Sequence, residues 1–189
     1  MTALNTRESL IEATEQLIRA KGFSAFSYAD LEREIGIRKA SIHYHFPTKE
    51  GLGICVVETY LIRLKAQLES IDRSSSSPSS RLKSFADLFT EYRSAGQLPL
   101  CGALASEMTL LPEPMQELTT AYLETQMHWL EGTIRDGIAG GEIPRTDDTR
   151  QKAFEILSLL EGASFVSWGL QNQEDLDRTI ISRVLGKCL

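Results

Sequence analysis

The amino-acid sequence predicts an all-α protein with a small amino-terminal group of helices and a larger carboxy-terminal group. Nearly every apolar pattern in the 189 residues repeats with the 3.6-residue period of a helix, and no segment shows the alternation typical of a strand. Proline and glycine residues separate these periodic segments. The hydrophobic share of 42% is sufficient for a buried core in a chain of this length.

Residues 1–50 predict three short helices. The first covers Thr6–Lys21 and ends at Gly22. Ser27-Tyr28-Ala29-Asp30 has the composition of a capped helix start, and Gly36 is typical of a helix end. A short basic helix follows directly. The order helix, glycine turn, basic helix is the pattern of a helix-turn-helix motif.

The stretch from Gly36 to Lys49 carries cations without acids, which sets it apart from the rest of the chain. The whole sequence has 26 acidic and 20 basic residues and a net charge of −6, whereas the first fifty residues are balanced. A protein that coats nucleic acid nonspecifically would be basic throughout. We therefore expect one local docking surface for double-stranded DNA, because a short cationic helix fits the major groove.

The segment ADLEREIGIRKASIHYHFPTKEGL resembles the amino-terminal DNA-binding domain of the TetR family of bacterial transcription regulators. The matching positions are Gly36, Ile42, Tyr44 or His45, Phe46, Lys49 and Leu52. The segment departs from the family pattern at Ala40, where glycine is usual, and at His43, where the family generally has a tyrosine that touches phosphate. The resemblance implies a ligand-controlled, homodimeric regulator, with residues 1–50 binding DNA and residues 51–189 binding effector and partner subunit.

The expected DNA contacts follow from this motif. Arg38 and Lys39 are expected at base edges or nearby phosphates, and Ser41, Tyr44 and Lys49 at phosphates. The full expected set is Ser27, Tyr28, Arg38, Lys39, Ala40, Ser41, His43, Tyr44, His45 and Lys49. Taken alone, so small a charge cluster also fits a solvated turn, and the histidines also fit core or capping positions. No cysteine or third histidine lies at zinc-ligand spacing, so no metal is expected.

The rest of the chain predicts a long fourth helix and five further ones. Their expected ranges are Thr48 to about Ile71, then about 81–94, 101–109, 114–139, 148–170 and 175–187, with a flexible polar loop at 74–80. Segment 148–170 is apolar around so much of its circumference that it must be covered from two directions. We therefore expect the last two helices to form half of an intersubunit four-helix bundle.

Aromatic and methionine side chains concentrate in the carboxy-terminal half, where an effector cavity is expected. The candidate ligand-binding residues are Phe85, Phe89, Tyr92, Cys101, Leu104, Met108, Tyr122, Phe165 and Trp168. The polar candidates to orient a ligand are Tyr92, Glu107, Tyr122, His128 and Glu161. Taken singly, each of these residues fits an ordinary core better than a pocket, and the identity of the effector cannot be predicted.

Cys101 supports an alternative function. The segment LPLCGALASEMTLLPEPMQ resembles a subset of TetR-like regulators with the pattern Cys-x-Cys-Gly-x-Leu-Ala-x-Glu, although Pro99 replaces the first cysteine. A cysteine at a helix start can have a lowered pKa and act as a redox or electrophile sensor. A buried cysteine is more commonly a small hydrophobic residue.

Other classes of protein fit the sequence less well. No nucleophile elbow, phosphate loop or metal motif is present, and Glu124 and His128 lack the Glu-x-x-His spacing of a helical metal site, so neither enzyme activity nor a cofactor is expected. An architectural DNA binder would need a basic body. There is no apolar amino-terminal run, and we expect Ile156–Leu170 to be too short to span a bilayer. Together with three unpaired cysteines, this predicts a cytoplasmic protein without membrane contact.

Overall fold

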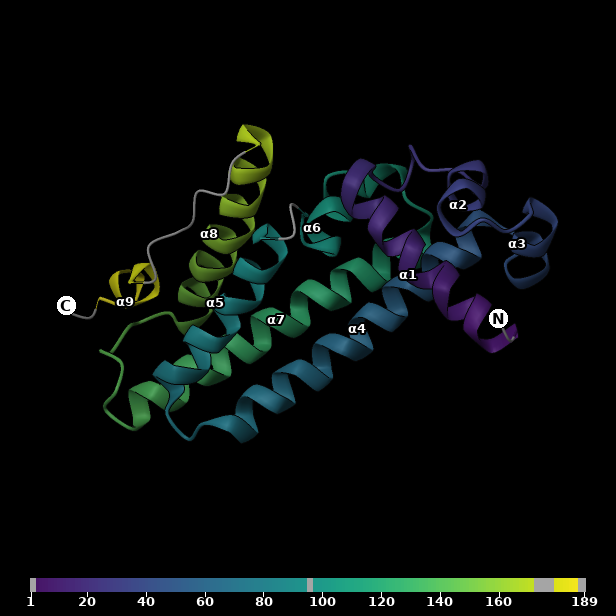
Figure 1. The fold of residues 1–189 in the computed structure, drawn as a ribbon. Helices are drawn as coiled ribbons and strands as arrows, with labels where there is room; N and C mark the ends of the chain where they lie inside the picture. Colours follow the sequence, from purple (N-terminus) through teal and green to yellow (C-terminus); the bar gives the residue numbers. More distant parts are fainter. Residues whose placement is uncertain (1–2, 95–96, 172–178, 187–189) are drawn as a thin grey trace. The chain divides into compact units, whose positions relative to one another are not determined.

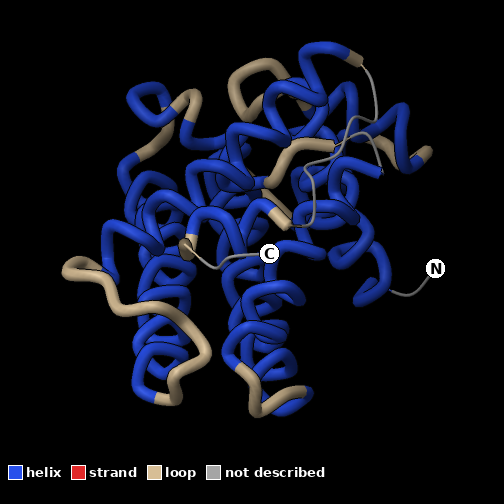
Figure 2. The backbone as a smooth tube through the Cα atoms, turned by 90° about the vertical axis from the view of Figure 1, so that its left-hand side faces the viewer, coloured by secondary structure: helices blue, strands red, loops and turns tan. Residues whose placement is uncertain are grey.

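The computed structural model describes residues 3–94, 97–171 and 179–186. Within these ranges the chain consists of helices and loops without a strand, which confirms the predicted all-α class (Figures 1 and 2). The chain divides into two compact units. The first unit contains Met1–Arg63 and Leu100–Ala121, and the second contains Leu64–Pro99 and Tyr122–Leu189. The expected functional boundary between residues 50 and 51 stays a prediction.

The first unit combines the amino-terminal helices with a segment from the middle of the chain. Its elements are α1 (Ala3–Lys21), α2 (Tyr28–Ile35), α3 (Lys39–His45), the first part of α4 (Lys49–Ser74), α6 (Leu100–Ala105), the 3-10 helix η1 (Met108–Leu110) and the start of α7 (Glu113–Ala139). α1 packs against both α2 and α6, and α2 packs against α3. The core includes Leu10, Ile18, Leu31, Ile42 and Leu52, all fully buried.

Local capping explains where the short helices begin and end. α2 starts after Ser27, whose backbone N–H donates to Asp30 Oδ2 at 2.8 Å, and it stops at Gly36, which has a left-handed φ of 73°. Thr48 Oγ1 accepts a hydrogen bond from the Gly51 N–H at 3.0 Å at the start of α4. These three predicted helix boundaries are confirmed.

The second unit is built from the remaining helices. It contains α5 (Pro78–Ser94), α8 (Thr149–Leu170), α9 (Ile180–Val184) and the carboxy-terminal parts of α4 and α7. α5 and α8 lie side by side (Figure 1). Phe85 of α5 stacks on Trp129 of α7 at a ring-centroid distance of 5.4 Å, and the Trp129 indole donates to the carboxylate of Asp72. Aromatic packing and one polar anchor therefore fix α7 within this unit.

Several expected helix limits differ from the structure. α5 already begins at Pro78, so the loop expected at 74–80 is shorter, because proline fits the first turn of a helix. The helix expected at 101–109 is divided into α6 and η1. α9 ends at Val184 instead of reaching 187, since Gly186 takes a left-handed φ of 70°. Leu176 of the expected last helix and Cys188 lie outside the described residues.

α8 agrees in its limits with the helix expected at 148–170. The stretch Ile156–Leu170 was expected to be too short for a bilayer, but the helix starts at Thr149 and has 22 residues. By length and composition alone it could cross a membrane. The core helix of a soluble protein meets the same criterion, so a single such helix is weak evidence for a membrane protein.

Candidate nucleic-acid interface

α3 is a short helix held by one buried side chain and by its neighbour α2. Ile42 is fully buried, and it is the buried residue of the helix. The Tyr28 hydroxyl donates to the Phe46 carbonyl at 2.7 Å, just after the end of α3. Burial raises the pKa of Tyr28, so this hydroxyl keeps its proton as a donor. α2 therefore fixes the carboxy-terminal end of α3.

The other side chains of α3 and its cap are available to a large partner. Arg38, Lys39, Ala40, His43 and Tyr44 are exposed, and Tyr44 is exposed to 81%. Ser41 and His45 are half-buried. The His43 ring packs edge-on against Tyr28, and its Nδ1 lies 3.3 Å from the Pro47 carbonyl, so the Nδ1–H tautomer can donate there. Four of the expected contact residues, Arg38, Lys39, His43 and Tyr44, are thus exposed on α3 and its cap.

Lys49 has a different environment from the other expected DNA contacts. Its Nζ donates to the Ser24 carbonyl at 3.2 Å and lies 4.7 Å and 4.6 Å from the ring centroids of Phe23 and Phe26. Burial lowers the pKa of Lys49, while the nearby carboxylate of Glu107 opposes this shift. The ammonium group therefore supports the loop between α1 and α2, a contact that sequence spacing did not predict.

Asp30 organises the start of α2. Its carboxylate accepts from both the backbone and the hydroxyl of Ser27 and pairs with Lys21 at 2.9 Å and Arg33 at 2.6 Å. The hydrogen bond from Lys21 and those from Ser27 hold the pKa of Asp30 well below its usual range. The expected contact residue Ser27 is therefore bound to Asp30 in this state.

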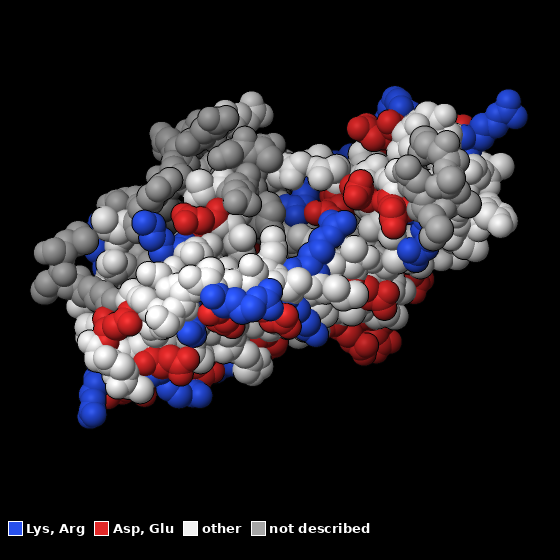
Figure 3. All heavy atoms as spheres, turned by 60° about the horizontal axis from the view of Figure 1, so that its bottom comes forward, with Lys and Arg blue, Asp and Glu red and all other residues white. Residues whose placement is uncertain are grey.

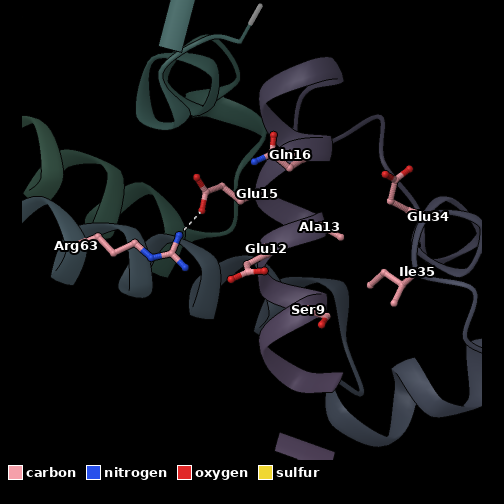
Figure 4. Close-up of a pocket in the computed structure, with 8 residues that line it drawn as sticks. All are labelled: Ser9, Glu12, Ala13, Glu15, Gln16, Glu34, Ile35 and Arg63. Carbon is pink, nitrogen blue, oxygen red and sulfur yellow. Dashed lines mark hydrogen bonds and ion pairs between the residues drawn. The ribbon is translucent and has the colours of Figure 1, made fainter. Parts of the chain in front are cut away.

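The first unit also has an open surface hollow of about 620 Å³ between α1, α2 and α4 (Figure 4). Its lining includes Glu12, Glu15 and Glu34. Glu15 is buried and pairs with Arg19 and Arg63, both at 2.8 Å. This acidic lining does not suit a phosphate.

On the face drawn in Figure 3, acidic and basic side chains are interspersed rather than gathered by sign.

The candidate ligand residues are distributed over both units. Cys101, Leu104 and Met108 belong to the first, and the others belong to the second. Most are buried by neighbouring side chains, but Met108 and Phe165 are half-buried and Trp168 is exposed to 46%. The backbone of Tyr92 lies in α5, whereas its side chain is outside the described residues.

The polar candidates also differ in their surroundings. Glu107 accepts two hydrogen bonds from Ser24, whereas His128 is exposed and its Nδ1 lies 2.7 Å from the Glu124 carbonyl. The carboxylate oxygens of Glu161 are buried. Among the described residues, no group of three or more His, Cys, Asp or Glu side chains could hold a metal.

Gln126 of α7 was not predicted as a functional residue. It is exposed to only 2%, and its Oε1 has no hydrogen-bond partner in the described part of the chain. A buried carbonyl oxygen without a partner costs about 1–3 kcal/mol. A single glutamine in a long amphipathic segment gives no periodic signal, so the sequence could not separate it from a surface amide.

In the described part of the chain, α2, the turn at Gly36 and α3 with its exposed cations form a helix-turn-helix motif, and the other elements are helices too. This arrangement defines the class of helix-turn-helix DNA-binding proteins. The family model of bacterial regulatory proteins of the tetR family matches residues 10–53. The model of the tetracyclin repressor-like carboxy-terminal domain matches residues 78–182, more than half of the chain. The chain belongs to the TetR family and is a DNA-binding regulator of transcription.

Similar proteins agree with this assignment. The TetR-family regulator of Agrobacterium tumefaciens is 25% identical, with a TM-score of 0.86 over 98% of this chain and 96% of its own. A TetR regulator of Legionella pneumophila is 30% identical, with a TM-score of 0.81 over 96% and 94%. The HTH-type regulator "in lacX 3'region" of Lactococcus lactis subsp. lactis is 30% identical over 60% of this chain and 62% of its own length. The chain thus spans less than two thirds of that relative.

Proposed function

We propose that this protein is a homodimeric, cytoplasmic repressor that a small molecule releases from its operator, without enzyme activity or cofactor. The observation that carries the proposal is the exposed α3, whose cap and first turn present Arg38 and Lys39. In a major groove, these cations reach base edges and phosphates. Tyr44, together with Ser41, His43 and His45, supplies phosphate contacts, and Ala40 leaves room for close approach.

Exposed apolar side chains on α8 support the proposed dimer. Ala153, Ile156, Leu157, Leu160, Ser164 and Ser167 form its buried side. Phe154, Val166, Trp168 and Leu170 remain 46–61% exposed. Gly162 has no heavy atom within 4 Å of the position of a Cβ, which allows a second helix to approach closely. A dimer formed through α8 and α9 would carry two copies of α3, one for each half-site of a symmetric operator.

The second unit supports the proposed control by a ligand. Phe85, Phe89, Tyr122 and Trp129 provide the apolar surroundings that small molecules use, and Gln126 provides a buried acceptor. A ligand that donates a hydrogen bond to Gln126 would favour the protein state in which that contact forms. The ligand shifts DNA binding only by its differential affinity for the two states.

Selection of DNA from a genomic pool tests the DNA-binding part of the proposal. The purified protein should enrich a pseudo-palindromic duplex with half-sites about one helical turn, or a multiple of it, apart. The affinity should fall steeply with salt, because Lys and Arg displace counterions from phosphate. Enrichment of unrelated, nonpalindromic sequences would contradict the proposed operator.

A thermal-shift screen with small apolar compounds that carry one hydrogen-bond donor tests the ligand part. Compounds that stabilise the protein should also release the enriched duplex. Gln126→Leu should weaken this response about tenfold, since one buried hydrogen bond contributes about 0.5–1.5 kcal/mol. The matched variant Gln67→Leu, at a half-buried glutamine of α4, should respond normally. An equal response of both variants would remove Gln126 from the site.

A further inference from the structure

Glu107 joins two parts of the first unit that lie far apart in the sequence. It sits between α6 and η1, and its Oε2 accepts hydrogen bonds from the backbone N–H of Ser24 at 2.8 Å and from the Ser24 hydroxyl at 2.9 Å. Ser24 belongs to the loop between α1 and α2. The carboxylate therefore fixes this loop through two charge-assisted hydrogen bonds, which are stronger than neutral ones.

The backbone of the loop is adapted to this carboxylate. Gly22 has a φ of 85°, a conformation that other residues rarely adopt. A Cβ at residue 22 would also overlap the carboxylate of Glu107. The glycine therefore serves two purposes, since it ends α1 and leaves space for an acid from another segment.

Lys49 completes the contact from the side of the DNA-reading helices. It lies in the first turn of α4, and it holds the carbonyl of Ser24 while Glu107 holds the amide and the hydroxyl of the same residue. The opposite charges of Lys49 and Glu107 also favour each other. Three residues beyond Ser24, the chain enters the cap of α2 at Ser27. The contacts thus fix the backbone just before the helix-turn-helix motif.

We propose that Glu107 is a positioning residue for DNA binding. This proposal rests on the proposed role of α3 in DNA binding. It adds a connection between α6–η1 and the helices that read DNA. Glu107 holds Ser24, Ser24 sets the entry into α2, and α2 holds α3 through Tyr28. A displacement of α6–η1 withdraws the carboxylate and frees the loop, so α3 loses its fixed orientation.

The sign of the effect on DNA affinity distinguishes this role from simple electrostatics. Removing an acid normally strengthens binding to a polyanion. We expect the opposite for Glu107→Ala, whose affinity for the duplex enriched by the wild-type protein should fall about tenfold with an unchanged salt slope. Glu117→Ala removes the same charge from an exposed position of α7, and its affinity should stay equal or rise slightly.

Gly22→Ala provides a second test through a double-mutant cycle. In the wild-type background the added methyl group displaces Glu107, so DNA affinity should fall. In the Glu107→Ala background the same change should cost clearly less, because only the backbone strain remains. Additive effects, or wild-type affinity of Glu107→Ala, would overturn the proposal.

Amide exchange of the free protein separates this proposal from the proposed function. In Glu107→Ala, the amides of residues 24–28 should exchange about tenfold faster, while the amides of the remaining first-unit core keep their protection. If the amides of residues 24–28 exchange in Glu107→Ala as they do in wild type, the positioning role is contradicted, even if the wild-type protein binds DNA. If the wild-type protein enriches no duplex, the proposed function fails, but the exchange measurement still decides whether Glu107 fixes the loop.

Discussion

α3 and α8 leave uncovered surfaces of opposite chemistry. α3 has seven residues, buries Ile42 and exposes Lys39 and Tyr44, and its cap exposes Arg38. α8 has 22 residues, buries one side within the second unit and exposes large apolar side chains on the other. A charged, hydrated surface suits a polyanion, whereas a broad apolar one suits another protein surface. The two helices therefore favour different partners. Substitutions on α8 should change the oligomeric state, and substitutions on α3 should change the direct contact with DNA.

The largest effect is expected from a charge on α8. Val166→Glu changes a side chain that is 61% exposed in the single chain, so the fold of the protomer should be unaffected. A buried unpaired charge at an interface costs about 3–5 kcal/mol, so the variant should sediment as a monomer where the wild-type protein is a dimer. Operator affinity should fall at least about a hundredfold, because a monomer engages one half-site.

Ile62→Glu provides the matched control for this charge. Ile62 is 68% exposed on α4, outside the α8 surface. The control should remain dimeric and should bind the operator within about threefold of wild type, because added acidic charge weakens DNA binding only modestly at physiological salt. A dimeric Val166→Glu protein, or a monomeric wild-type protein, would contradict the proposed interface and the operator symmetry.

The next effect is expected at α3. Arg38→Ala should weaken operator binding by about 1–3 kcal/mol and relax sequence preference at one base pair, without altering the melting temperature. Competition between the operator and single-base variants measures both quantities. Lys65→Ala removes an equal charge from an exposed position of α4 and should leave sequence preference intact. If wild type and Arg38→Ala discriminate equally between the operator and its single-base variants, Arg38 contacts phosphate rather than a base.

Lys49→Ala should affect stability more than direct contact with DNA. The substitution removes a hydrogen bond to Ser24 and contacts with two aromatic rings. These contacts contribute about 1–2 kcal/mol, which corresponds to a fall of about 2–8 °C in melting temperature for a chain of this size. The slope of affinity against salt should hardly change. A slope that flattens by about one unit would restore the phosphate contact that the motif implies.

The features that the sequence predicted correctly depend on neighbouring residues. Gly36 ends α2 because the left-handed φ at this position favours glycine. Thr48 caps α4 because its hydroxyl accepts a hydrogen bond from the backbone N–H three residues further on. Capping residues of this kind can be recognised in the sequence without knowledge of the tertiary structure. The acid-free stretch around Arg38 is equally local, so the position of the basic helix could be predicted.

The features that the sequence did not predict depend on distant contacts. Glu107 meets Ser24 across 83 residues, so no periodic pattern relates the two side chains. Phe85 and Phe89 are buried, and such residue types occur both in cores and in ligand cavities, so composition cannot separate these environments. Gln126 is distinguished only by burial, which requires the tertiary structure.

Asp30, at the start of α2, gives a smaller effect that depends on pH. Its pKa is lowered in the folded protein by hydrogen bonds from Lys21 and Ser27, so its stabilising contribution is fully present above the unfolded pKa of about 3.9. This contribution is lost as the pH falls below that value toward the lower folded pKa. Asp30→Asn should therefore melt at a lower temperature than wild type at pH 7, and the difference should shrink below about pH 4.

Asp87→Asn is the control for this pH dependence, since Asp87 is an exposed acid of α5. Its melting temperature should follow that of wild type across the same pH range. A constant difference between Asp30→Asn and wild type from pH 7 to pH 3 would indicate a change in packing at α2 rather than the loss of a titrating group.

Cys101 is expected to have the smallest effect on DNA binding, although it begins a helix as a sensor would. Its side chain is fully buried, as are those of its helix neighbours Leu100 and Leu104, so an oxidant cannot reach it without local opening. Cys101→Ser should bind and release the operator as wild type does, and mild oxidant should release neither protein. In a Cys188→Ser background, a thiol reagent should modify half-buried Cys55 before Cys101. If oxidant releases wild-type protein while Cys101→Ser stays bound, the thiol is the sensor, and local opening at α6 becomes the signal that reaches α3.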